Sequence, residues 1–397
     1  MMNRSILLLS LLSLWLCLPH VACCEEADTL RLIHRVGVDF RPSRIVQDDP
    51  FFEGENQLGR PMRFGYSCHL KYSFQFAENS RMGTLYPHTY QGIGLSYNDL
   101  GNRKEIGLPV AVYAFQGSHI AILSSALSLD YEWNFGASFG WKKYDGISNP
   151  NNTVVGSKVN AYINLGFLLN WQVAPRWNLT AGVDLTHYSN GNTGYPNLGV
   201  NMVGGRVGLA YSLHPEGSMR RAVSSSRDMG FKPYVSYDVV VYGAGRKRAF
   251  ITDDECFMIP GTFGIVGMNF TPMYNFNRFF RAGLSLDAQY DESANVAAYY
   301  VGGGQDAPRF YRPSFRKQFA VGLSARGELV MPFFAVNIGL GYNVWQKGED
   351  TKGWYQVLAL KTSITRQLFL HVGYQLSRFK DPSNLMLGLG WRFGARP

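Results

Sequence analysis

The sequence RWNLTAGVDLTHYSN, at residues 176–190, alternates apolar and polar side chains along its whole length. Its odd positions run from Trp177 to His187 and Ser189, whereas its even positions include Asp184. Strict alternation over ten or more residues predicts a β-strand with one apolar face. From Trp177 to His187 such a strand would extend roughly 33 Å, or about 25 Å of height at a tilt of about 40°. We therefore expect its odd face to meet lipid and its even face to line the lumen of a membrane barrel.

Other parts of the chain repeat this pattern, notably residues 158–171 and 334–344, and these segments are longer than the strands of most soluble proteins. Short connections are expected near 174–175, 272–275, 331–332 and 366–367, and long polar ones near 143–154, 244–256, 291–316, 346–353 and 379–384. One-sided long loops are typical of bacterial outer-membrane barrels. The fold prediction is all-β: a transmembrane antiparallel up-and-down β-barrel of 12–16 strands, forming a single domain over residues 25–397. A soluble β-sandwich or propeller would not explain the strand length or the one-sided loops.

Composition agrees with this class of protein. Of the 397 residues, 14% are aromatic and only 17% are charged, and 43 are glycine. Disordered chains lack aromatic residues, so disorder is excluded. Beyond the first two dozen residues, no apolar run reaches the roughly 18 residues that a spanning helix needs, which excludes a helical membrane protein.

The first 24 residues are predicted to be a secretory signal peptide. Arg4 precedes an apolar stretch at residues 6–18, and small residues precede the acidic pair at 25–26. A lipid anchor on Cys23 is the alternative, although His20 stands where a lipoprotein signal carries an aliphatic residue. Export through such a signal, together with the barrel, places the protein in the bacterial outer membrane.

The candidate chemistry lies at the end of the 176–190 strand. A hairpin centred on Gly194 pairs residues whose numbers sum to 388, which puts Asn201 directly opposite His187. A hydroxyl at Ser189, an imidazole at His187 and an amide at Asn201 then share the outward face. A hydroxyl becomes a nucleophile when a base takes its proton, and a third group orients that base. The alternative interpretation is that these are ordinary polar residues at the membrane interface, with no catalytic role.

The motif His-Tyr-Ser-Asn at 187–190, followed by Pro-Asn-Leu-Gly at 196–199, resembles the signature of the PagL-type outer-membrane lipid A 3-O-deacylases. The resemblance covers about forty residues, including the strands at 179–186 and 203–211, and the much longer chain resembles an enlarged branch of that family. It implies that His187 is the general base and Ser189 the nucleophile, and that Asn190 and Asn197 form the oxyanion hole. An acidic residue of the family corresponds to Asn201 here.

The replacement of that acid by Asn201 puts the rate of turnover in doubt. An amide orients an imidazole but does not stabilise the imidazolium with a full charge. The enzyme is therefore slower, or another carboxylate helps, or the site has decayed. Asp184 is expected on the lumen face and is not a candidate.

The resulting prediction is a serine esterase that hydrolyses an ester-linked acyl chain of lipid A, with lipopolysaccharide of the outer leaflet as its partner. The alternative function is a non-catalytic barrel, a pore or scaffold, that keeps a relic of the motif. Which acyl chain is removed, the number of subunits and conduction through the lumen stay open at this stage.

Other signals in the sequence are weaker. Basic clusters in two long loops are either contacts for lipid A phosphates or solvated loop residues, and they comprise Arg246, Lys247, Arg248, Arg309, Arg312, Arg316 and Lys317. The formal net charge of +9 is scattered, so nucleic-acid binding is not expected. Neither a cofactor nor a metal site is predicted, and Cys68 and Cys256 are assigned no function.

Overall fold

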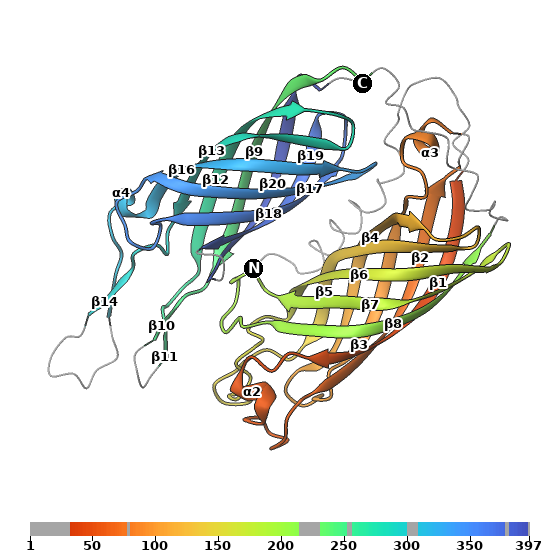
Figure 1. Cartoon of the computed structure of the whole chain (residues 1–397). Helices are drawn as coiled ribbons and strands as arrows, with labels where there is room; N and C mark the ends of the chain where they lie inside the picture. Colours follow the sequence, from red (N-terminus) through yellow and green to blue (C-terminus); the bar gives the residue numbers. More distant parts are fainter. Residues whose placement is uncertain are drawn as a thin grey trace, which may run out of the picture.

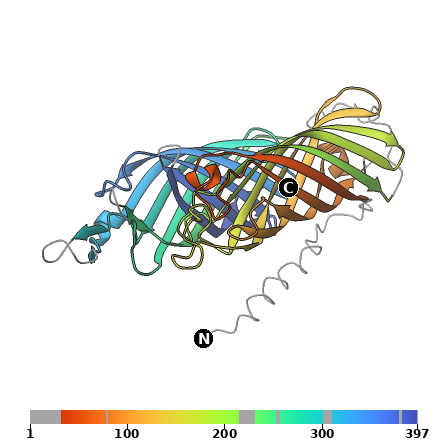
Figure 2. The same cartoon turned by 90° about the horizontal axis from the view of Figure 1, so that it is seen from below.

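The computed structural model describes residues 32–77, 80–213, 231–251, 256–299, 309–377 and 381–395. The signal peptide predicted at residues 1–24 lies outside them. Within the described ranges the chain forms two closed antiparallel barrels of eight strands each and two small two-stranded sheets. Figure 1 shows the two barrels side by side, the first in orange to yellow-green and the second in green to blue. The view from below in Figure 2 shows the same two adjoining cylinders.

The strands are long, as the alternation predicted. The first barrel comprises β1 Leu32–Ile45, β2 Phe64–Phe76, β3 Tyr90–Asp99, β4 Gly107–Ile122, β5 Leu127–Trp141, β6 Val159–Ala174, β7 Trp177–Ser189 and β8 Val200–Ser212. The second comprises β9 Tyr234–Arg246, β12 Phe263–Asn275, β13 Phe280–Asp291, β16 Phe319–Val330, β17 Phe334–Trp345, β18 Trp354–Ser363, β19 Leu368–Ser377 and β20 Asp381–Phe393. The hairpins are β10 Ala249–Ile251 with β11 Cys256–Met258, and β14 Ala297–Tyr299 with β15 Arg309–Tyr311.

The predicted all-β, antiparallel up-and-down barrel fold is confirmed, but the strands do not form one closed sheet. β8 pairs back onto β1, with Ser212 opposite Arg35. β20 pairs back onto β9, with Phe393 opposite Tyr237. The single domain expected over residues 25–397 is therefore replaced by two barrels. The physical reason is that alternation specifies which face of a strand is apolar, whereas closure depends on the partner that the eighth strand finds.

Each barrel turns apolar side chains outward and polar ones inward. On β7 and β8 the outward Val183, Leu185, Val203 and Val207 are 50–59% exposed. On β6 the outward residues are the odd-numbered ones and on β17 the even-numbered ones, as their alternation predicted. The odd face of β7 therefore belongs to the lipid side of the wall.

Charged side chains fill the lumen of the first barrel. The buried network consists of Arg41, Lys71, Arg206, Asp39, Glu132 and Asp184. Arg206 Nη2 lies 2.7 Å from Asp39 Oδ2 and 2.9 Å from Glu132 Oε1, and Lys71 Nζ lies 2.7 Å from Glu132 Oε2. An eight-stranded barrel has an interior that side chains just fill. Here the paired charges fill it together with buried aromatic side chains such as Tyr113 and Tyr162.

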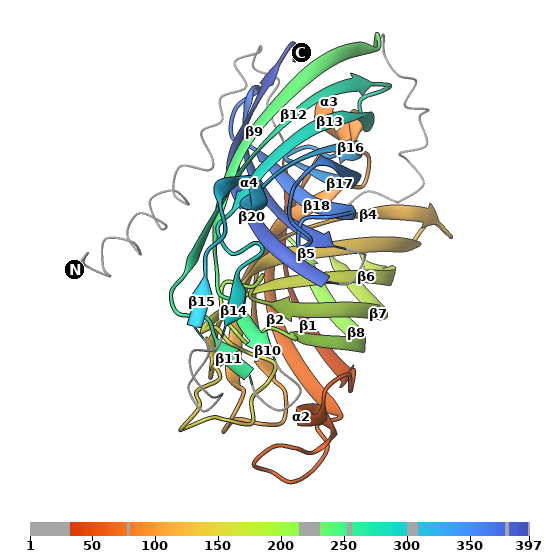
Figure 3. The same cartoon turned by 90° about the vertical axis from the view of Figure 1, so that its left-hand side faces the viewer.

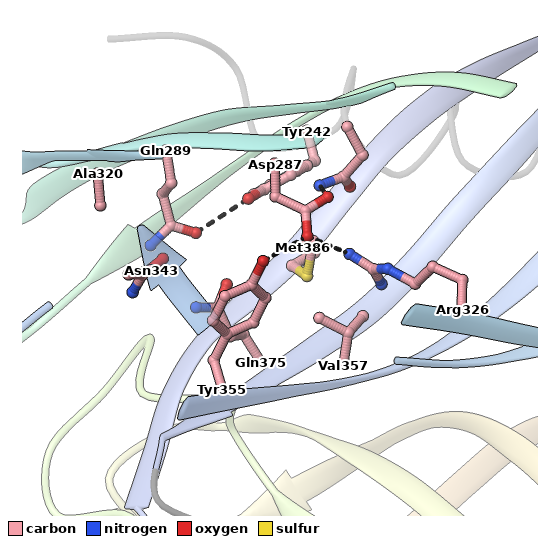
Figure 4. Close-up of a pocket in the computed structure, with 11 residues that line it drawn as sticks. Tyr242, Asp287, Gln289, Ala320, Arg326, Asn343, Tyr355, Val357, Gln375 and Met386 are labelled. Atoms are coloured by element: carbon pink, nitrogen blue, oxygen red, sulfur yellow. Dashed lines mark hydrogen bonds and ion pairs between the residues drawn. The ribbon is translucent and has the colours of Figure 1, made fainter. Parts of the chain in front are cut away.

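The second lumen is built in the same way. Lys361 Nζ lies 2.9 Å from Asp238 Oδ2 and 2.6 Å from Glu328 Oε2. Figure 4 shows a small cavity beside Asp287, which accepts hydrogen bonds from Tyr355 and Arg326. Its volume of about 10 Å³ has room for about one water molecule and none for an acyl chain.

Most of the long connections lie at one end of the barrels, whereas the connection that carries α3 (Arg81–Leu85), between β2 and β3, lies at the other. Figures 1 and 3 show α2 (Pro50–Glu53) and the two hairpins toward the lower end, and α3 toward the upper end. A third short helix, α4 (Phe315–Gln318), directly precedes β16. We call the lower end, which also carries the loop at 190–199, the loop end, and the upper one the turn end.

Two predicted connections are wrong in detail. Residues 272–275 belong to β12, and the turn follows at 276–279. Pro272 faces Tyr237 of β9, whereas the ladder to β13 has pairs at Phe270 and Met273 but none between them, so the missing N–H of proline falls at an interruption of that ladder. The connection predicted at 379–384 is shorter, because β20 already begins at Asp381. No helix among the described residues is long and apolar enough to cross a membrane.

Candidate active site

The register of the β7–β8 hairpin places the candidate residues together. Leu185 pairs with Val203 and His187 pairs with Asn201, which confirms the predicted pairing. His187 and Ser189 are half-buried on the outward face, whereas the intervening Tyr188 is buried in the lumen. The Tyr188 hydroxyl donates to Asn98 Oδ1 at 2.9 Å. This bond anchors the strand from inside while its two neighbours face outward.

Asn201 connects His187 to a carboxylate that the sequence motif does not contain. His187 Nδ1 lies 2.7 Å from Asn201 Oδ1. Asn201 Nδ2 in turn donates to Asp48 Oδ2 at 3.1 Å. The main chain fixes the same position, because Val46 N–H donates to the Asn201 carbonyl oxygen at 2.9 Å. Asp48 lies just beyond the end of β1, in the connection that leads to α2.

Ser189 and His187 border the same glycine. A Cβ atom added to Gly199 would lie 3.3 Å from His187 Cε1 and 3.6 Å from Ser189 Cβ. Among the described residues Ser189 Oγ has no hydrogen-bond partner, so it is not bonded to His187 in this state. Unliganded active sites often have such long contacts, and rotation about a single serine torsion re-aims Oγ. The two side chains are therefore close neighbours on one surface.

The loop at 190–199 is held by its own asparagines. Asn190 N–H donates to Asn197 Oδ1 at 2.8 Å, and Asn197 Nδ2 donates to Asn192 Oδ1 at 3.1 Å. The Asn190 side chain is 5% exposed and bonds within the loop to Gly194 N–H and the Pro196 carbonyl. Both predicted oxyanion residues thus lie beside Ser189, but their side-chain amides shape the loop. The main-chain N–H of Asn197 has no acceptor within the described part of the chain.

A second loop of the first barrel supports this one from the side. Gly199 N–H donates to the Val154 carbonyl oxygen at 3.1 Å. The two loops approach so closely at Gly194 and Gly156 that a Cβ on Gly194 would lie 2.5 Å from the Gly156 oxygen. Only glycine fits such a contact, so these positions set how the 190–199 loop lies on the 142–158 connection.

The other candidates lie elsewhere. Asp184 faces the lumen as expected, with Oδ2 3.6 Å from Arg41 Nη1. Arg246 Nη1 lies 3.1 Å from Asp291 Oδ2, and Arg248 Nη1 lies 2.5 Å from Asp350 Oδ2. Burial acts to raise the pKa of Asp350, but the hydrogen bond from Arg248 outweighs it and holds the pKa below its usual value. Two members of that basic cluster are therefore engaged within the protein.

The basic residues of the other loop lie apart from the candidate residues. Arg312 Nη1 lies 2.5 Å from Glu292 Oε1. Arg316 and Lys317 belong to α4, and Arg309 begins β15. Cys68 is a free, exposed thiol on β2.

Asp48 is the residue that sequence reasoning missed. It lies 153 positions before Asn201, and the local sequence Gln47-Asp48-Asp49 carries no motif. Asp48 could have been identified only from the pairing of β1 with β8, and that pairing can be predicted only if the first barrel is known to have eight strands.

Comparison with known proteins gives two matches to sequence families, one for each barrel. Residues 64–210 match the family described as lipid A 3-O-deacylase (PagL). Residues 235–395 match the family described as acyloxyacyl hydrolase, C-terminal domain. The first match begins after Asp48 and contains all the residues of the candidate motif. No curated protein matches the chain.

Several solved outer-membrane proteins are similar at low identity. The siderophore receptor PirA from Acinetobacter baumannii is 9% identical over 88% of this chain and 68% of its own, with a TM-score of 0.23. A Rhodopseudomonas blastica porin variant is 7% identical over 91% of this chain and 100% of its own, with a TM-score of 0.17. Likenesses this weak carry no argument. The two family matches together cover most of both barrels, and the chain therefore belongs to the outer-membrane lipid A 3-O-deacylase (PagL) family.

Proposed function

We propose that this protein is an outer-membrane serine esterase that removes an ester-linked acyl chain from lipid A, with Ser189 as nucleophile, His187 as general base and Asn201 as the group that orients the base. The observation that carries the proposal is the 2.7 Å contact between His187 Nδ1 and Asn201 Oδ1 on the same outward face as Ser189. It directs the other imidazole nitrogen, Nε2, away from Asn201 and leaves it available to the serine hydroxyl.

The position of these residues suits a substrate that is embedded in the membrane. His187 and Ser189 follow the lipid-facing Val183 and Leu185 on one strand, at the loop end of the wall. Acyl chains of the outer leaflet would pack against the apolar stretch, and their ester groups would lie near the polar end. No transfer of the lipid into a lumen is required, and the first lumen is filled by paired charges.

The reaction has two steps. In the first, Ser189 Oγ attacks the ester carbonyl carbon while His187 Nε2 takes the hydroxyl proton; the ester carbon–oxygen bond then breaks, and the departing oxygen of lipid A receives that proton. In the second, water attacks the acyl-serine with His187 again as base, which releases the fatty acid and restores Ser189.

The oxyanion would be stabilised by donors of the 190–199 loop. The main-chain N–H of Asn197 is our proposed donor, because it has no acceptor within the described residues. Asn190 contributes by holding the loop, with its own N–H bonded to Asn197 Oδ1 at 2.8 Å. A single such donor is typically worth roughly 3–4 kcal/mol in the transition state.

The decisive experiment is mass spectrometry of lipid A from cells that express the wild type or Ser189→Ala. We expect loss of one ester-linked acyl chain with the wild type and none with the variant. Equal acyl patterns at equal amounts of folded protein would refute the esterase and leave the non-catalytic barrel. Asp184→Asn is a useful comparison, since Asp184 faces the lumen and is not predicted to take part in the reaction.

A further inference from the structure

We propose that Asp48 is a positioning residue that acts on His187 through Asn201 and supplies the negative charge that the amide lacks. This inference rests on the proposed function. It assigns a role to a residue outside both family matches, which begin at residue 64 and at residue 235.

The first argument concerns the orientation of the amide. Asn201 could present either its oxygen or its NH₂ group to His187. A carboxylate only accepts hydrogen bonds, so Asp48 Oδ2, at 3.1 Å, requires the NH₂ group on its own side. The Asn201 oxygen is then directed at His187 Nδ1 at 2.7 Å. That nitrogen must carry the hydrogen, and Nε2 is left as the lone-pair base that the reaction needs.

The second argument concerns charge. When His187 takes the proton of Ser189, a positive charge forms on the imidazole, and a full negative charge nearby stabilises it. Asn201 has none, but the carboxylate of Asp48 is one amide away and polarises that amide in the favourable direction. Because Asp48 is exposed, solvent screens this effect, and we expect a contribution to rate of about threefold to tenfold.

The fold also explains why Asp48 is available there. β1 ends at Ile45, and Val46 continues the pairing by donating to the Asn201 carbonyl oxygen at 2.9 Å. The next residues then leave the barrel wall toward α2, whose N-cap is Asp49 with an oxygen 2.9 Å from Phe51 N–H. Asp48 is therefore held between a strand pairing on one side and a capped helix on the other.

The test is a double-mutant cycle measured as the maximal deacylation rate on lipid A in detergent micelles. In the Asn201 background we expect Asp48→Asn to lower the rate threefold to tenfold, because the charge and the fixed amide orientation are both lost. In an Asn201→Glu background the carboxylate contacts His187 directly and is repelled by Asp48, so Asp48→Asn should then have no cost or raise the rate.

The matched control is Glu53→Gln, which removes an exposed carboxylate from the same connection and should leave the rate unchanged. An Asp48→Asn variant as fast as the wild type would overturn the proposal, and so would an equal loss in both backgrounds, which indicates a purely structural role. Failure of the proposed esterase itself is recognised separately, because Ser189→Ala and the wild type would then leave identical lipid A.

We also infer, from different contacts, that the second barrel holds the 190–199 loop in its active shape. Lys247 N–H, directly after β9, donates to the Asn192 carbonyl oxygen at 3.0 Å. Asn192 Nδ2 donates to the Ser383 carbonyl oxygen of β20 at 3.4 Å. Gly191 packs on the same strand, since a Cβ placed there would lie 3.3 Å from Leu385 Cβ.

These contacts connect directly to the proposed oxyanion loop. Asn192 Oδ1 accepts from Asn197 Nδ2 at 3.1 Å, and Asn197 Oδ1 accepts from the N–H of Asn190, the residue after Ser189. A displacement of the second barrel would therefore be transmitted through two side chains to the nucleophile. The C-terminal barrel is on this account a positioning domain for the N-terminal one.

Leu385→Ala in the full chain tests this. We expect a severalfold lower maximal rate with unchanged apparent KM, because the loop is shaped for the transition state. The control is Phe333→Ala, which removes ring contacts between the barrels near the turn end. The centroid of the Phe333 ring lies 6.0 Å from that of Phe74 and 6.1 Å from that of Phe76. A Leu385→Ala rate equal to the wild type, or an equal loss in Phe333→Ala, would contradict the inference.

A cross-link gives an independent measurement. The 3.3 Å separation at Gly191 and Leu385 is close to the roughly 3.5–4.5 Å between Cβ atoms in disulfides. A Gly191→Cys, Leu385→Cys double variant should form this disulfide in oxidised membranes, identified by peptide mapping. Because Gly191 has a φ of +63°, which strains a cysteine there, the reference is the reduced double variant and not the wild type. The oxidised form should be at least as active as the reduced one. No cross-link, or inactivation on forming it, would overturn the inference.

Discussion

Gly199 lies against His187 so closely that a Cβ atom added to it would sit 3.3 Å from the imidazole Cε1. The same atom would lie 2.6 Å from the main-chain oxygen of Tyr188, between the base and the nucleophile. Gly199 also has a φ of +79°, which L-residues rarely adopt. The fourth residue of the Pro-Asn-Leu-Gly segment thus leaves open the space in which Ser189 and His187 meet.

Gly199→Ala should therefore reduce deacylation by at least a hundredfold while the barrel still folds. The measurement is the single-turnover rate of purified protein on lipid A. Gly101→Ala is the matched control, because Gly101 has a φ of +80° but its added Cβ would meet only the Phe64 oxygen, at 3.5 Å. Comparable losses in the two variants would show that backbone strain, and not the space beside His187, is responsible.

Glu132→Ala should destabilise the first barrel by about 3–5 kcal/mol, since removing one partner of a buried ion pair leaves uncompensated charge. Lys71 Nζ and Arg206 Nη2 would each lose a partner, now 2.7 Å and 2.9 Å away. The melting temperature, followed by the mobility shift of the folded barrel on gels, reports the loss. Glu349→Ala removes an exposed pair with Lys352, at 3.3 Å, and should change the free energy of unfolding by less than about 0.5 kcal/mol.

Neither lumen should carry a steady ion current. The first is filled by the network around Arg206, and the second by the network around Glu328. Purified protein reconstituted in planar bilayers should show conductance no higher than that of protein-free bilayers. Stable single-channel steps would favour the pore interpretation and would contradict the side-chain packing described above.

Asn201→Glu should raise the deacylation rate if position 201 orients the base. A glutamate carboxylate would bring a full negative charge to His187 Nδ1, which now contacts only the neutral Asn201 Oδ1 at 2.7 Å. Steady-state rates with lipid A at equal amounts of folded protein measure this. An unchanged rate would mean that the residue at 201 does not act on His187.

Alternation and hairpin symmetry were sufficient to predict the wall that carries the site. The outward position of His187, the inward position of Asp184 and the pairing of His187 with Asn201 all follow from a period of two and a turn at Gly194. These are local properties, so they are readable from one sequence. The catalytic roles of the residues stay predictions until the variants are measured.

Closure and long-range contacts could not be predicted in the same way. The pairing of Arg35 with Ser212 joins segments far apart in the chain, and no pattern in either strand indicates with which strand it pairs. The contact between Asp48 and Asn201 depends on that pairing. The contact between Asn192 and Ser383 depends further on how the second barrel lies beside the first.

The seam between β1 and β8 has a consequence for biogenesis. Asp48 follows β1 and Asn201 lies at the start of β8, so the 3.1 Å bond between them forms only when these two strands pair and close the barrel. A nascent chain that is still threading into the bilayer therefore carries Ser189 and His187 without this bond. On the proposed mechanism, a barrel that has not closed would therefore deacylate about threefold to tenfold more slowly than the closed one, and the full rate would be reached only when insertion is complete.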